Sequence, residues 1–327
     1  MITINSIKYN NTSHLTQKYT YGSKDFSYYQ MSKTSKNMFL STFEYIDLGT
    51  SIINVGIHYS RMLAKATLPK DKITFMSVLK TKDNRGLCKA QKVKENMIFC
   101  LNECTSLSFV FTPGTIWTAF QISIKELEKL NFDINKFTNT YIKNTDKSAK
   151  EASLRIKKII KYLHNSSKKD LLEVDEKALH KNLLHAFIKS FINAKDIDDL
   201  EKNAYKNIAI QTYNYIRDNS DYPITMRDLS KVIKTSERTI QRAFKLYYDT
   251  TLQNFIKIHR LHKVHKKLLT NPKKITITEI AFKHGFTHLS RFAQNYKELF
   301  QELPSETYRK SHSKLIIRKN NTIIKSD

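Results

Sequence analysis

Apolar residues recur at helical spacing in two similar segments near the carboxyl end of the chain, Thr225 to Tyr247 and Ile277 to Phe300. Each segment predicts a short helix with one apolar face, a tight turn, and a longer helix with polar and cationic residues on its other faces. The apolar positions of the first segment are Met226, Leu229, Val232, Ile233, Ile240, Phe244 and Tyr247.

The second segment follows the same pattern. Thr225 and Ser236 are predicted N-caps in the first segment, and Thr278 or Thr276 is the predicted cap in the second. Gly285 supplies a turn position that favours positive φ. The apolar positions here are Ile277, Ile280, Ala281, Phe282 and Phe286, then Leu289 or Phe292, Tyr296 and Phe300.

A third helix is predicted between these segments, from about Leu252 to Leu269, with a broad apolar stripe and a basic remainder. A helix of about 18 residues spans about 27 Å, long enough to hold two DNA-reading helices in adjacent major-groove turns about 34 Å apart.

The first 200 residues have a different pattern of apolar positions. Short apolar runs with period-two alternation predict strands there. Asp83-Asn84-Arg85-Gly86 and Pro113-Gly114 are predicted turns. This spacing predicts an antiparallel sheet or small barrel. The candidate strands lie at Phe43–Ile46, Ile53–Tyr59, Ile73–Leu79, Met97–Leu101, Leu107–Phe111 and Ile116–Ile122.

Helices follow these strands. A short helix is predicted at Ile124–Leu130, a second through Leu154–Leu163 and one long helix from Leu171 to Ala194. Asn139–Lys150 is predicted to be a polar connection. An acidic run, Asp196–Glu201, leads to a further helix, so the boundary between domains is placed near residues 196–204.

The chain has 327 residues and a net charge of +26, enough length for two cores and a charge that favours a polyanionic partner such as nucleic acid. Residues 205–327 carry a net charge of +14 and the longer remainder +12. The charge is therefore denser at the carboxyl end. The alternative is that the positive charge only reflects an overall composition rich in Lys, Asn and Ile.

The three cysteines, Cys88, Cys100 and Cys104, are interpreted as ordinary thiols in a reduced, cytoplasmic compartment. No secretory leader, long apolar run, phosphate-cradling glycine motif or defensible catalytic set is found, so we expect no membrane segment, cofactor, metal or enzymatic activity. His262, His265 and His288 are expected on the surface or beside phosphates.

The two C-terminal segments have the pattern of helix-turn-helix units. Their residues resemble the DNA-binding domain of AraC-type (AraC/XylS family) transcription regulators, over about a third of the chain. The matching positions include Leu229, Ser236, Arg238, Ile240, Arg242, Phe244, Arg260, Leu261, Ile277, Ile280, Ala281, Gly285, Phe286, Phe292, Tyr296, Pro304, Ser305, Tyr308 and Arg309.

Two positions depart from the family pattern. The family usually has glycine where Tyr248 or Asp249 closes the first unit and where Gln301 precedes Pro304. These turns are therefore expected to be built differently here.

The resemblance implies that the second helix of each unit reads DNA bases. The implied base readers are Arg238, Gln241, Arg242, Ser290, Arg291 and Gln294, and the expected phosphate contacts are Thr225, Thr239, Lys245, Thr278 and Lys297. Arg can donate two hydrogen bonds to guanine O6 and N7, and Gln can form hydrogen bonds with both N6 and N7 of adenine. The resemblance also brings Leu289 to a reading position. The alternatives are that some of these residues only form solvated helix faces and that Leu289 belongs to the core.

The expected fold is therefore α+β. A β-rich domain, cupin-like or a small barrel with a helical hairpin, spans residues 1–200. An all-α domain with two helix-turn-helix units spans 201–312, and a basic tail spans 313–327. The expected function is a sequence-specific transcription regulator that reads two successive major grooves with its two helix-turn-helix units, and we expect an activator. The alternative is a non-specific nucleic-acid-binding or nucleoid protein.

Double-stranded promoter DNA and RNA polymerase are the expected partners. A homodimer and a small-molecule effector are both left open, since the first domain could serve only for dimerisation or polymerase contact. No effector residues are identified. Aromatic residues that could line an effector pocket, or equally form plain core, are Phe75, Phe99, Phe109, Phe111, Trp117 and Phe120.

Overall fold

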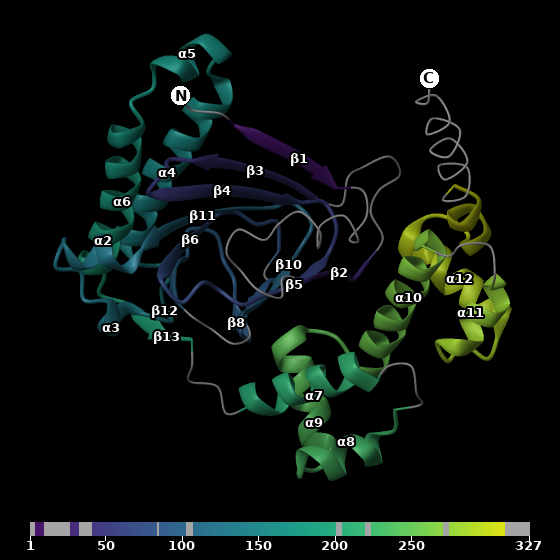
Figure 1. Ribbon diagram of the computed structural model, residues 1–327. Coiled ribbons are helices and arrows are strands. Elements are labelled where there is room, and N and C mark those ends of the chain that lie inside the picture. Colours follow the sequence, from purple (N-terminus) through teal and green to yellow (C-terminus); the bar gives the residue numbers. More distant parts are fainter. Residues whose placement is uncertain are drawn as a thin grey trace, which may run out of the picture. The chain divides into compact units, whose positions relative to one another are not determined.

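A computed structural model describes residues 4–9, 27–32, 41–83, 85–102, 107–200, 205–219, 224–270 and 275–310. The expected basic tail 313–327, Asn84 and Cys104 lie outside these residues. The chain forms two compact units (Figure 1). The first comprises Met1–Gln30 with Asn37–Lys206, and the second Met31–Lys36 with Asn207–Asp327. The first is rich in strands and the second is helical, as the sequence predicts.

The first unit contains two antiparallel sheets. The order of the eight-stranded sheet is β1-β3-β4-β11-β6-β9-β12-β13, and that of the five-stranded sheet is β2-β5-β10-β7-β8. The strands are β1 Asn5–Tyr9, β2 Ser27–Gln30, β3 Ser41–Asp47, β4 Ser51–His58, β5 Met62–Ala66, β6 Lys72–Lys80, β7 Leu87–Cys88, β8 Gln91–Lys92, β9 Ile98–Leu101, β10 Leu107–Phe111, β11 Thr115–Ser123, β12 Thr140–Ile142 and β13 Ile197–Asp199.

All six candidate strands of the sequence are present, as β3, β4, β6, β9, β10 and β11. Asn139–Lys150 is not merely a polar connection, because it contains β12 and the start of a helix. The acidic run after residue 195 likewise contains β13. These two strands pair with each other through only three residues each. Such short strands give too few alternating positions to be recognised.

Helices α2 Ile124–Glu128, α3 Ile134–Phe137, α4 Lys147–Asn165, α5 Lys168–Glu173 and α6 Glu176–Asn193 complete the unit. The single long helix expected from Leu171 to Ala194 is wrong. Val174 and Asp175 are extended, and the Asp175 carboxylate accepts hydrogen bonds from the backbone N–H groups of Lys177 and Ala178. A new helix therefore starts there, although the apolar stripe continues in the sequence.

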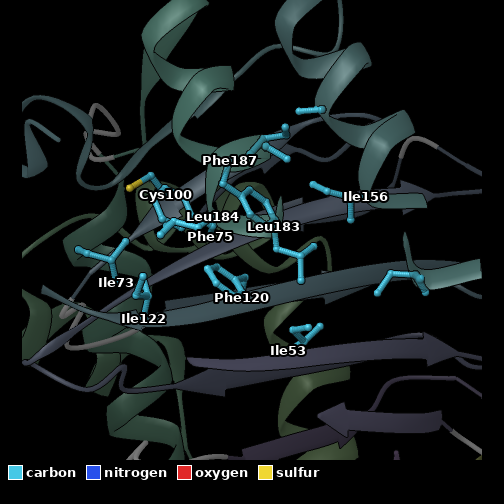
Figure 2. Packing of buried hydrophobic residues seen from close by; sticks show 14 of the residues in the cluster. Ile53, Ile73, Phe75, Cys100, Phe120, Ile122, Ile156, Leu183, Leu184 and Phe187 are labelled. Atoms are coloured by element: carbon cyan, nitrogen blue, oxygen red, sulfur yellow. The ribbon is translucent and has the colours of Figure 1, made fainter. Parts of the chain in front are cut away.

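Core side chains pack on both faces of the eight-stranded sheet. On one face, Phe75 and Phe120 pack with Phe187 of α6 (Figure 2), and α4 and α6 run side by side in Figure 1. On the other face, Phe99 packs with Phe109 of the five-stranded sheet. The six aromatic residues considered for an effector pocket are therefore divided between two cores. They do not line one shared cavity.

Asp146 fixes the start of α4. Its carboxylate accepts hydrogen bonds from the backbone N–H of Ser148 at 2.8 Å, Lys195 at 2.8 Å and Asp196 at 3.0 Å. Burial alone would raise the pKa of this carboxyl group, but these hydrogen bonds, together with one from the Ser148 hydroxyl, lower it to about 2. Asp146 thus ties the start of α4 to the strand that follows α6.

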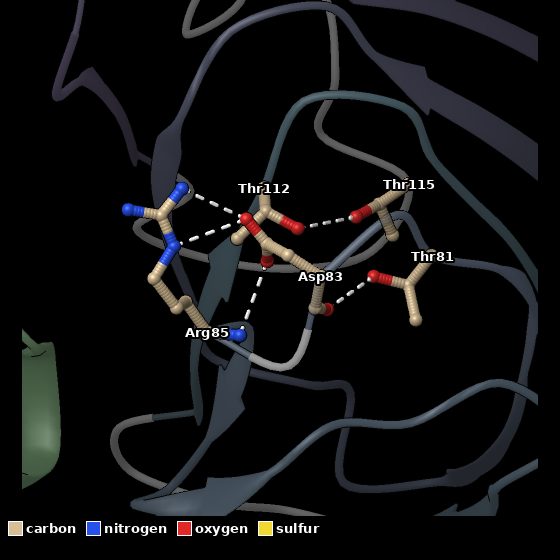
Figure 3. A network of polar contacts seen from close by, with 5 residues as sticks. All are labelled: Thr81, Asp83, Arg85, Thr112 and Thr115. Carbon is tan, nitrogen blue, oxygen red and sulfur yellow. Dashed lines mark hydrogen bonds and ion pairs between the residues drawn. The ribbon is translucent and has the colours of Figure 1, made fainter.

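The predicted turn at Asp83 is stabilised by its own side chain (Figure 3). The Asp83 carboxylate accepts hydrogen bonds from the backbone N–H and the guanidinium of Arg85, and the Thr81 hydroxyl donates to the Asp83 carbonyl. Burial would raise the pKa of Asp83, but the hydrogen bonds from Arg85 and Thr112 lower it overall. The local bonds to Arg85 favour a tight turn here.

The second unit consists of α7 Lys206–Asn219, α8 Met226–Ile233, α9 Glu237–Tyr248, α10 Leu252–Thr270, α11 Ile277–Lys283 and α12 Leu289–Phe300, followed by a helical stretch at 304–310. Helices α7, α9 and α10 pack through an aromatic cluster in which Tyr213 of α7, Phe244 and Tyr248 of α9 and Phe255 of α10 meet. The far end of α10 packs against α11 and α12. Helix α10 therefore contacts α7 and α9 near its start and α11 and α12 near its end.

The two turns expected to be built without the family's glycine both have a left-handed backbone conformation. Asp249 after α9 has φ +48°, and Gln301 after α12 has φ +61°. Both are left-handed helix ends of the kind that glycine usually occupies. Lys234 after α8 is a third example, with φ +55°. The expectation was wrong because a non-glycine residue can adopt this conformation at a cost in free energy.

Candidate nucleic-acid interface

Helix α8 and the turn after it are fixed by local hydrogen bonds. Thr225 and Asp228 form a capping box, in which the Thr225 hydroxyl accepts from the Asp228 N–H at 3.1 Å and the Asp228 carboxylate accepts from the Thr225 N–H at 3.1 Å. Lys234 ends the helix in the left-handed region. The Ser230 hydroxyl then donates to the Thr235 carbonyl at 2.6 Å and holds the turn before α9.

Helix α9 divides cleanly into a buried and an exposed side. Ser236 caps it by accepting a hydrogen bond from the Thr239 N–H at 3.1 Å. The buried side consists of Ile240, Ala243, Phe244, Tyr247 and Tyr248. The exposed side carries Arg238, Gln241, Arg242 and Lys245, which follow each other at intervals of three, one and three residues and so form one stripe.

Helix α12 has a similar division. Its buried residues are Phe292, Tyr296 and Leu299. Ser290, Arg291, Gln294 and Lys297 are all exposed. Phe292, and not Leu289, belongs to the core, because Leu289 is 37% exposed. Every residue expected to read bases therefore has an accessible side chain.

The first turns of these helices differ. The Ser236 side chain caps α9, whereas His288 at the N-cap of α12 makes no side-chain capping hydrogen bond. The first backbone N–H groups of α12 therefore receive no such bond from their own cap, and they carry the positive end of the helix dipole.

Acidic residues also lie on these helices, which the sequence reasoning did not consider. The Lys245 ammonium lies 3.2 Å from the Asp249 carboxylate, and the Gln294 amide donates to the Glu298 carboxylate at 3.2 Å. Such exposed contacts contribute about 0–1 kcal/mol. DNA phosphates or bases can therefore replace them at little cost.

Of the three threonines expected to contact phosphate, Thr225 and Thr278 have different surroundings. The Thr225 hydroxyl already donates to the Asp228 carboxylate at 2.6 Å. Thr276, and not Thr278, caps α11, since its hydroxyl accepts from the Glu279 N–H at 3.2 Å. Thr278 is exposed and lies in the first turn of that helix.

A buried hydrogen-bond chain fixes α12 against α10. The Tyr296 hydroxyl lies 2.6 Å from Nδ1 of His265 and donates to the Thr307 hydroxyl at 2.8 Å, which in turn donates to the Glu302 carboxylate. Since Tyr296 already donates its proton, Nδ1 of His265 must be the donor to it. The His265 ring also stacks on Phe300, with 4.3 Å between ring centres.

The buried ring of His265 is neutral, since protonation would add an N–H at Nε2, which is buried and has no hydrogen-bond partner among the described residues. Burial, assisted by neighbouring His262, lowers the pKa of His265 to about 3. Burial raises the pKa of Tyr296. The expectation that His265 lies at the surface was wrong, because only 5% of it is exposed. His265 lies four residues after Leu261 and so on the same buried face of α10. The apolar spacing alone does not distinguish a buried histidine from one at the surface.

Gly285, at the turn between α11 and α12, has φ +77°. A Cβ atom at this position would lie 2.9 Å from Nη1 and 3.1 Å from Cζ of Arg260 on α10. The glycine thus permits both the turn and the close approach of the Arg260 side chain.

Metal ligands and cysteine thiols offer no further site within the described ranges. No cluster of three or more His, Cys, Asp or Glu residues there could hold a metal ion. Cys88 and Cys100 are buried, and burial raises the pKa of the Cys100 thiol. Among the helices of the described part, none combines the length and apolar character needed to cross a membrane.

Comparison with known proteins gives a family match in the helical unit. Residues 229–310 match the model of a family described as "Helix-turn-helix domain". The chain is 35% identical over 96 residues to a XylDLEGF operon transcriptional activator of Pseudomonas putida, which is 29% of this chain and 30% of that protein. It is 34% identical over 109 residues to the probable thc operon regulatory protein of Rhodococcus erythropolis, 33% of each chain.

The chain thus matches about a third of the length of these curated relatives. A solved structure of a probable AraC family transcriptional regulator from Rhodopseudomonas palustris is 33% identical, with 32% of this chain and 97% of that chain covered and a TM-score of 0.31.

Proposed function

Because the chain belongs to the AraC/XylS family of helix-turn-helix transcription regulators, we propose that it binds promoter DNA sequence-specifically and activates transcription. In this proposal α8–α9 and α11–α12 are two helix-turn-helix units, and α9 and α12 enter two successive major grooves. The observation that carries the proposal is the pair of exposed Arg- and Gln-bearing stripes on α9 and α12, each opposite a buried apolar face.

The side chains of the stripes suit base edges. Arg238, Arg242 and Arg291 can each donate two hydrogen bonds to guanine O6 and N7, and Gln241 and Gln294 can bridge adenine N6 and N7. Ser290, at the open start of α12, can reach either a base or the backbone. Arg238 and Arg291 form no ion pair with any residue that the structure describes, so their guanidinium groups are available to DNA.

Phosphate contacts would surround these readers. Lys245, Lys297, Thr239, Thr225 and Thr278 are the proposed phosphate-binding residues. The N–H groups at the start of α12 add donors of the kind that bind phosphate oxygens, because its N-cap side chain does not occupy them. The proposal therefore predicts that DNA affinity falls steeply as the salt concentration rises.

The length of α10 supports simultaneous binding by both units. Its 19 residues span about 28 Å. Successive major-groove turns on one face of DNA lie about 34 Å apart. A helix pair packed at each end of α10 can therefore approach both turns, because each reading helix adds its own width.

The remaining parts receive proposed roles as well. Residues 1–200 form a domain for dimerisation, effector sensing or both, with its two sheets in a cupin-like or barrel arrangement, and residues 201–312 form the DNA-binding domain. RNA polymerase is the proposed partner in activation. No catalysis forms part of this proposal.

A footprint on DNA upstream of the protein's own gene and its neighbours tests the proposal. Two bound helix pairs of one subunit should protect two adjacent major-groove turns, and a dimer should protect two such sites. The specific site should be preferred over random DNA by about a thousandfold or more at physiological salt. Equal affinity for both DNAs would instead support the alternative of a non-specific nucleoid protein.

A further inference from the structure

The first unit has a groove with an apolar floor that the proposed DNA interface does not use. It lies between α4 and the eight-stranded sheet and has a volume of about 480 Å³. This size is within the range of small-molecule sites. The floor consists of aliphatic side chains from three strands and α4: Val55, Ile57, Leu79, Ile116 and Ile160.

Most of the charged residues at the rim of the groove are cationic. The rim residues are Lys80, Glu95, Lys157, Lys161 and His164. Two of the basic groups have acidic partners, since the Lys157 ammonium lies 2.7 Å from the Glu95 carboxylate and Nε2 of His164 lies 2.8 Å from that of Glu44.

Lys80 and Lys161 differ from these two. Both are exposed, and neither forms an ion pair with a residue in the part of the chain that the structure describes. The groove thus combines an aliphatic surface with two ammonium groups that no carboxylate among the described residues neutralises.

We propose that this groove binds an amphipathic carboxylate, with its hydrocarbon part on the aliphatic floor and its carboxylate between Lys80 and Lys161. Charge complementarity selects this class of ligand. A polar anion such as phosphate would leave the floor in water, and a neutral hydrocarbon would leave both ammonium groups without a partner. Control of DNA binding by such a ligand rests on the proposed function, but binding itself does not.

Isothermal titration calorimetry of the full chain without DNA tests the apolar half. The probes are linear saturated carboxylates from butanoate to decanoate, each below its micelle concentration. Affinity should rise with every methylene group, by up to about fourfold each. Octan-1-ol should bind more weakly than octanoate, and octyltrimethylammonium should not bind. Affinity that is independent of chain length would overturn the proposal.

Charge reversal at the rim tests the cationic half. The double variant Lys80→Glu/Lys161→Glu should weaken octanoate binding about tenfold or more. Lys150→Glu/Lys158→Glu is the matched control, because both lysines are exposed on α4, as Lys161 is, and neither lines the groove. It should bind octanoate like the parent. Circular dichroism confirms that the variants fold. Equal weakening by both variants would reveal only general attraction to a basic protein and would overturn the site.

The link to regulation is measured separately, by the affinity for promoter DNA with and without octanoate. Binding of octanoate together with failure to bind specific DNA would retain the groove and refute the proposed function. Specific DNA binding without any octanoate binding would do the reverse.

Discussion

Acidification should destabilise the packing of α12 against α10, because unfolding allows His265 to bind a proton. The folded pKa of this histidine is about 3, whereas its ordinary value is 6.5. Between these values the unfolded chain binds a proton that the folded chain excludes, so the stability contributed by the neutral ring is complete above pH 6.5 and is lost as the pH falls toward 3. Between pH 7 and pH 5, the free energy of unfolding of the second unit should fall by about 2 kcal/mol.

The reasoning is testable by hydrogen exchange with mass spectrometry at pH 7 and pH 5. After correction for intrinsic rates, peptides from α10 and α12 should exchange about 30-fold faster at the lower pH when exchange occurs by unfolding of the unit. A local measurement is needed because burial also lowers the pKa of His58, in the first unit, to about 3.

Two variants separate protonation from simple loss of a contact. His265→Gln cannot titrate but keeps an N–H that can donate to Tyr296, so its exchange in α12 should depend much less on pH. Tyr296→Phe leaves the His265 N–H buried without its acceptor and should cost about 1–3 kcal/mol at both pH values. If His265→Gln shows the parent's full pH dependence, the assignment of the effect to His265 is refuted.

Three further predictions concern stability. Gln301→Gly should raise the free energy of unfolding in urea by about 0.5–1 kcal/mol, because glycine relieves the left-handed conformation; Gln301→Ala should not, and a gain with alanine would contradict the role of backbone strain. Gly285→Ala should cost about 1–3 kcal/mol through its positive φ and its approach to Arg260, and unchanged thermal unfolding would contradict the packing described. Asp146→Asn should cost about 2 kcal/mol at pH 7, and the difference should vanish as the pH falls below 3.8 and through about 2; a difference that persists at lower pH would exclude the carboxylate as its cause.

The sequence predicted most of the helical unit because its signals are local. Apolar spacing and capping residues such as Ser236 define the helices, and the exposed stripe on α9 follows directly from that spacing. The same signals failed where two causes compete. The apolar stripe through Leu171–Ala194 is continuous, but the cap at Asp175 interrupts the helix.

Longer-range features were not predictable in this way. Strands β12 and β13 depend on pairing between residues far apart in the sequence, as in Thr140 with Asp199, and each is only three residues long. The burial of His265 depends on Tyr296 and Thr307 from other helices. The groove under α4 likewise joins side chains from three strands and a helix. None of these arrangements leaves a periodic signal in the sequence.

The central claim is that α9 and α12 read bases in two separate major-groove turns. The most direct test is to measure the affinity of Arg242→Ala and Arg291→Ala for a promoter site and for a panel of its single-base variants. Each substitution should cost about 1–3 kcal/mol on the parent site and abolish discrimination at one position, and the two positions should lie about one helical turn apart. Equal losses on every DNA sequence, or loss of discrimination at the same position by both variants, would contradict the account.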